Sequence, residues 1–160
     1  MNTNNKLNII LAAGLIFNYG LVFAQSSGGP DNNQRFTTSM TQITAALSIQ
    51  HGITNDPNCK GKKYTSITVD DYVDFIAAKD EKDGKSPKTK AEKDELMKTI
   101  GNVININIPG KGPIWRETYN LMMKNIINYS QLSGEALCDS LNGTANSLYQ
   151  KSMDNLRLMK

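Results

Sequence analysis

Few side chains in this 160-residue chain could act as a nucleophile, an acid–base pair or a metal ligand. His51 is the only histidine, so a histidine-based metal cluster is excluded and a catalytic triad would have to form around this single ring. Because a helix is predicted to end next to His51, we interpret this residue as a cation that interacts with the negative end of the helix dipole. Pairing of the two cysteines, Cys59 and Cys138, would leave no thiolate for nucleophilic catalysis.

The acidic and glycine-containing segments do not complete a catalytic motif. Gly84-Lys85-Ser86 ends like a phosphate-binding loop, but Lys79 stands where that loop requires its first glycine. The same segment, aligned as a calcium loop, places Lys79 and Lys90 at ligand positions. The carboxylates of segment 70–74 fall at the start of a predicted helix, where they complement the helix dipole. We therefore predict no enzyme activity, no cofactor and no metal site.

Two segments contain residue types that predominate in protein–protein interfaces. The first is the 110–119 region, where a glycine-flanked lysine is followed by aromatic residues and an arginine, types enriched among interface hot spots. The second is the long polar loop 52–67, which is rich in lysine and carries the first cysteine. The candidate binding residues are Lys111, Trp115, Arg116 and Tyr119 in the first segment and Lys62 and Tyr64 in the second. Core packing is the alternative for Trp115, because it shares a helical stripe with Tyr119.

The first 24 residues have the pattern of a cleaved secretory signal peptide. Lys6 is their only charge, segment 9–17 is apolar, and Val22-Phe23-Ala24 places small residues where signal peptidase requires them. The apolar run is too short for a membrane-spanning helix, which needs roughly 20 residues. We expect no stable membrane insertion after cleavage, and a periplasmic or secreted location.

The predicted export bears on the state of the two cysteines, and the net charge bears on the class of partner. In an oxidising compartment an even pair of cysteines usually forms a disulfide, so we predict a bond between Cys59 and Cys138. Removing Lys6 with the signal peptide lowers the formal net charge from +3 to +2. This small surplus argues against a nucleic-acid partner, which would need a strongly basic face.

Hydrophobic periodicity predicts helices and no convincing sheet. After a flexible lead-in at 25–33, we expect one helical domain at 34–160, an all-α bundle of about five helices with one disulfide. Capping boxes are predicted at Thr68 and Thr89 and a partial cap at Ser133. The first helix overlaps the end of the lead-in, and segment 104–108 alternates as a strand would but has no evident partner. The expected helices cover 32–50, 68–79, 89–105, 113–129 and 134–156.

With no catalytic or cofactor motif, binding to another protein is the leading functional hypothesis. In general architecture, the predicted domain resembles the periplasmic immunity proteins that block toxins of competing bacteria, and helical accessory subunits of secretion machinery. The alternative hypothesis is a carrier for a small apolar ligand or lipid. Such a carrier would use Met97, Met122 and Met123 to line an adaptable cavity between helices.

Overall fold

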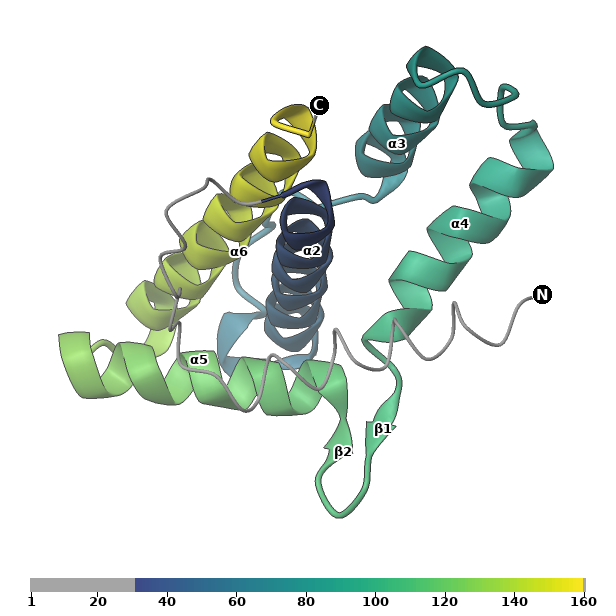
Figure 1. Cartoon of the computed structure of the whole chain (residues 1–160). Helices are drawn as coiled ribbons and strands as arrows, with labels where there is room; N and C mark the ends of the chain where they lie inside the picture. Colours follow the sequence, from purple (N-terminus) through teal and green to yellow (C-terminus); the bar gives the residue numbers. More distant parts are fainter. Residues whose placement is uncertain (1–30, 160) are drawn as a thin grey trace.

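The computed structural model describes residues 31–159, so the predicted signal peptide at 1–24 and residues 25–30 of the lead-in lie outside the described residues. The described part is helical apart from one small antiparallel hairpin (Figure 1). The helices are α2 (Asn32–Asn55), η1 (Pro57–Cys59, a 3-10 turn), α3 (Asp70–Lys82), α4 (Lys90–Val103), α5 (Ile114–Ser130) and α6 (Gly134–Arg157), and the strands are β1 (Asn107–Ile108) and β2 (Gly112–Pro113). The prediction of an all-α bundle with five α-helices and one disulfide is confirmed.

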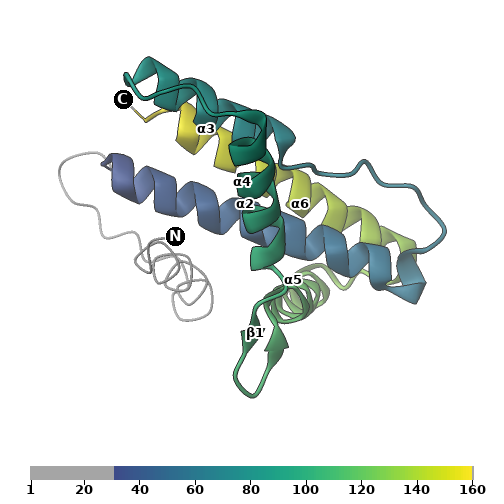
Figure 2. The same cartoon turned by 90° about the vertical axis from the view of Figure 1, so that its right-hand side faces the viewer.

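The two longest helices, α2 and α6, form the centre of the fold. They run antiparallel and lie side by side in both views (Figures 1 and 2). α5 crosses this pair at the C-terminal half of α2, while α3 packs near the end of α6 and α4 crosses α2 on its way back to the hairpin (Figure 2). Segment 31–159 contains no helix with both the length and the apolar character that crossing a bilayer requires.

Buried apolar side chains form two main clusters. The first lies where α2, η1, α5 and α6 meet and contains Ile49, Ile53, Cys59, Tyr119, Cys138, Leu141 and Ala145. The second lies between α2, α3, α4 and the end of α6 and contains Ile43, Tyr72, Val73, Ile100, Met153 and Leu156. Burial of such side chains is the main favourable contribution to folding, so each end of the α2–α6 pair has its own core.

A buried hydroxyl cluster also joins three helices. The Ser39 hydroxyl donates to the backbone carbonyl of Ser152 at 2.8 Å and lies 2.9 Å from the Tyr72 hydroxyl oxygen. Ser39 and Ser152 are fully buried, and burial raises the pKa of Tyr72 to about 12. Because buried polar groups are costly without partners, this cluster fixes how α2, α3 and α6 face one another.

The helix starts agree with the predicted caps in part. Thr89 and Glu92 form the expected capping box of α4, and Asp31 with Gln34 forms a second one before α2, so residues 32 and 33 belong to a helix and not to a lead-in. The capping box predicted at Thr68 is wrong. α3 begins at Asp70 after Val69, which makes no side-chain cap, and the carboxylates of its first turn supply the favourable dipole interaction instead. Ser133 precedes α6 without a side-chain cap hydrogen bond.

The first helix is longer than predicted, because Gly52 does not end it. α2 continues to Asn55, and Gly52 is buried inside it, directly against the ring of Tyr119. A Cβ at this position would overlap ring atoms, so glycine is needed for the close approach of α5. His51 consequently lies a turn before the helix end, and its interpretation as a cation at the C-terminal dipole is wrong.

Segment 104–113 also differs from the prediction. α4 ends at Val103, and β1 pairs with β2 through Asn107 opposite Pro113 and Ile108 opposite Gly112. The alternating pattern at 104–108 therefore had a partner, but a two-residue strand of glycine and proline is too short and too featureless for periodicity to reveal.

We predict that Gly52→Ala destabilises the protein by about 1–3 kcal/mol, because the added methyl group overpacks the contact with Tyr119. Gly143→Ala is the matched control, since a Cβ built there meets nothing within 4 Å beyond its chain neighbours and its own helix backbone, and alanine favours a helix interior by about 0.5–1 kcal/mol. Urea unfolding of both variants tests this, and equal effects at the two positions would contradict the proposed contact.

Candidate functional site

The β1–β2 hairpin projects from the helical body beyond α5 (Figures 1 and 2). Its tip is a tight turn, in which the Lys111 N–H donates to the Ile108 carbonyl at 3.0 Å. Pro109 precedes Gly110, whose φ is 74°, and this order suits a type II turn, which requires a positive φ at its third residue. Residues 109–111 are exposed. The hairpin therefore presents a compact, conformationally restricted tip to the solvent.

The base of the hairpin is fixed to the start of α5. The N–H groups of Ile114 and Trp115 donate to the carbonyls of Ile106 and Ile104, both at 2.9 Å. These bonds satisfy donors in the first turn of α5, where Pro113 provides no side-chain cap. Ile108 also packs on the buried side chains of Val103 and Ile114. The orientation of the hairpin relative to α5 is thus fixed by backbone and apolar contacts together.

Trp115 lies at the foot of this hairpin and is half-buried, between the core and surface placements considered for it. One contact of its ring is with His51, at 4.7 Å between centroids and 63° between ring planes. The guanidinium carbon of Arg116 lies 5.4 Å from the centre of the tryptophan ring. A Cβ on Gly112 would lie 3.8 Å from Nη1 of Arg116, which places the guanidinium beside the hairpin. The structure therefore brings together Trp115, Arg116 and the hairpin that carries Lys111.

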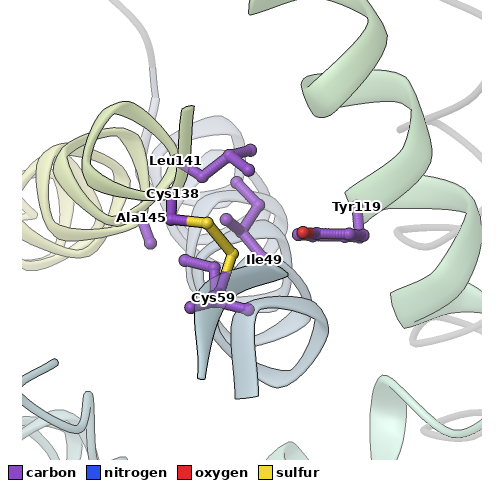
Figure 3. Packing of buried hydrophobic residues seen from close by; sticks show 7 residues of the cluster. Ile49, Cys59, Tyr119, Cys138, Leu141 and Ala145 are labelled. Carbon is purple, nitrogen blue, oxygen red and sulfur yellow. A yellow bond between two sulfur atoms is a disulfide. The ribbon is translucent and has the colours of Figure 1, made fainter. Parts of the chain in front are cut away.

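Tyr119 belongs to the core and is not available as a direct contact. It is 6% exposed, and its side chain points into the cluster that surrounds the disulfide (Figure 3). Its hydroxyl donates to Oδ2 of Asp56 at 2.7 Å. This hydrogen bond holds the pKa of Asp56 below its ordinary value of 3.8, while burial and the nearby carboxylate raise the pKa of Tyr119. Tyr119 thus links α5 to the end of α2.

The predicted disulfide is present between Cys59 and Cys138, whose Cα atoms lie 5.6 Å apart. Figure 3 shows it joining the turn after α2 to α6, within the first apolar cluster. Both cysteines are buried. A covalent link across 79 residues restricts the unfolded chain and attaches the loop that follows η1 to the helical pair.

The second candidate surface, predicted as loop 52–67, includes the end of α2 and η1, and only residues 60–67 of it form a loop, which is held by contacts within the chain. Lys62 forms ion pairs of 2.8 Å with both Glu135 and Asp139, and the Tyr64 hydroxyl donates to Asp139 at 3.0 Å. These partners, Asp139 first, raise the pKa of Lys62. The Gln50 side chain adds two hydrogen bonds of 2.8 Å to the loop backbone. Lys62 and Tyr64 therefore position the loop on α6, and a partner would have to compete with these contacts.

The three methionines invoked for a ligand carrier do not meet at one place. Met122 and Met123 pack against the first cluster, whereas Met97 packs against the second. A pocket of about 170 Å³ beside the disulfide is lined by the two cysteines and Gly61 together with the polar and charged side chains of Asn58, Lys62, Tyr64 and Glu135. Within residues 31–159, no group of three or more histidine, cysteine or acidic side chains is arranged to hold a metal ion.

Sequence reasoning missed the strand that pairs with segment 104–108 and the contact of His51 with Trp115. The alternating isoleucines of segment 104–108 and the Pro109-Gly110 turn together could have indicated a hairpin. The contact between His51 and Trp115 joins two helices that are distant in sequence, so no local pattern could have indicated it.

We predict that Tyr119→Phe destabilises the protein at pH 7 by about 1–2 kcal/mol, because it removes a hydrogen bond to a charged carboxylate but keeps the ring. Asp56 has a lowered pKa in the folded state, so its stabilisation is complete above pH 3.8 and is lost as the pH falls through the folded pKa. The difference from the wild type should therefore shrink at about pH 2. Urea unfolding at both pH values tests this, with the 89% exposed Tyr129 changed to Phe as the control; an equal loss at both pH values would contradict it.

Comparison with known proteins gave no relative for this chain. No family model matches it, and neither a curated protein nor a solved structure does. Its function is therefore inferred from the contacts and charges described above.

Proposed function

We propose that this chain is an exported, periplasmic or secreted protein-binding domain whose contact surface is the β1–β2 hairpin with Trp115 and Arg116 at its base. The observation that carries the proposal is a projecting hairpin whose tip and base are both fixed by hydrogen bonds. The partner that binds the hairpin would be one of two kinds of protein. It would be a protein that this chain inhibits, as immunity proteins inhibit toxins, or a component of a secretion machine.

The fixed conformation favours binding for a thermodynamic reason. Ordering a loop when a complex forms reduces affinity, and a surface that is already ordered avoids that loss. The tip turn and the bonds from α5 to residues 104 and 106 provide such order before any partner arrives. Tryptophan and arginine at the base are the residue types that most often dominate binding energy at interfaces.

The proposed location is supported by the cysteine pair. The disulfide joins residues far apart in sequence and is buried within a core cluster, so the fold benefits from a compartment in which the bond persists. The signal-like composition of the first 24 residues supports the same location.

The test places a photo-crosslinking benzoylphenylalanine at the exposed position Asn107, in the full chain expressed in its native host. The control places the same residue at Asn128, which is also exposed and lies about 20 Å along α5 from the start of that helix at the hairpin. We expect one protein to be crosslinked in stoichiometric yield from position 107 and not from position 128, as identified by mass spectrometry. No product from 107, or the same products from both positions, would overturn the proposed surface.

A further inference from the structure

Arg116 is one of several described basic residues outside the ion pairs, and it is distinguished by its contact with an aromatic ring. Many described basic side chains are neutralised by carboxylates within the molecule, namely Lys62, Lys79, Lys85, Lys88, Lys93 and Arg157. Arg116 is exposed, and among the described residues no carboxylate lies within ion-pair distance of it. Its guanidinium lies instead over the ring of Trp115, and its charge remains uncompensated by an ion pair.

The ring beneath Arg116 is itself fixed. The backbone N–H of Trp115 is bonded to the Ile104 carbonyl, and its half-buried ring has the His51 ring against it. Because the platform is fixed, the guanidinium loses part of its rotamer freedom before it meets a ligand. A contact with an aromatic face uses no hydrogen-bond donor, so the N–H groups in the plane of the guanidinium stay available.

Such an arrangement matches carboxylates and phosphates, and of these two groups the carboxylate is the one that unmodified protein side chains supply. A planar guanidinium presents parallel N–H donors that fit the two oxygens of a carboxylate, in a charge-assisted and bidentate pair. Lys111, at the tip of the same hairpin, adds positive charge to this side of the molecule. The nearest carboxylate in sequence is that of Glu117, which follows Arg116 and is half-buried. Among the ion pairs of the described residues, it does not pair with Arg116.

We infer that Arg116, supported by Trp115, is a carboxylate-binding site that receives an aspartate or glutamate side chain from an acidic site on the protein partner. This inference rests on the proposed function for the identity of the ligand as part of a protein. The binding of a carboxylate by Arg116 can be measured without the partner, so the two proposals can fail separately.

The first experiment titrates the mature chain with sodium acetate, at ionic strength held constant with sodium chloride, and follows the arginine Nε–Hε signals by NMR. The sequence has three arginines, so Arg35 and the ion-paired Arg157 serve as internal references. We expect the Arg116 signal to shift and saturate at an acetate concentration several-fold lower than the references require. Arg116→Lys removes the signal and so assigns it. Equal, unsaturated responses of all three arginines would overturn the inference while leaving the hairpin surface untouched.

The second experiment measures the affinity for the protein crosslinked from position 107. Arg116→Lys keeps the charge but loses the bidentate geometry, and we expect it to weaken binding about 10- to 100-fold, whereas the exposed Lys124→Gln on the same helix should have no effect. Trp115→Leu should weaken binding and abolish the preferential acetate response, with folding checked by circular dichroism. Unchanged affinity of Arg116→Lys would overturn the carboxylate contact. The absence of any crosslinked partner would overturn the proposed function, while the acetate titration alone decides whether Arg116 binds a carboxylate.

Discussion

The close packing of the Tyr119 ring on the backbone of Gly52 is the contact on which the position of the hairpin depends. It lets α5 approach α2 more closely than any larger residue would permit, and the bond from Tyr119 to Asp56 fixes the end of α2 in the same place. The start of α5, and with it the hairpin, is positioned by this crossing. The glycine at position 52 therefore contributes to the direction in which the hairpin points, because it sets how closely α5 packs on α2.

The two candidate surfaces differ in how their polar groups are used. In loop 60–67, lysine and tyrosine side chains are engaged by carboxylates of α6, and the disulfide lies next to them. At the base of the hairpin, backbone bonds hold the conformation and the arginine side chain is supported by an aromatic ring. Charged side chains therefore maintain the fold at the first surface, whereas backbone groups maintain it at the second and leave the arginine exposed.

The sequence predicted the fold class, the disulfide and most helices, because these depend on periodicity, caps and compartment, all of which are local or compositional. It failed where tertiary contact overrode a local signal. Gly52 has the propensity to end a helix, yet the helix continues because the glycine is packed beneath a ring from another helix. The candidate site was predicted in part: Trp115 and Arg116 do lie together, but only the three-dimensional structure shows that Tyr119 is buried and that His51 contacts Trp115.

The antiparallel course of α2 and α6 also determines how the molecule can be attached to other things. The first residue of α2 and the last residue of α6 lie near one another and away from the hairpin in both views (Figures 1 and 2). A surface, a second domain or an affinity tag joined at the start of α2 or the end of α6 is therefore anchored on the side remote from the hairpin. The architecture gives the domain a polarity in which one side is suited to tethering and the other faces outward.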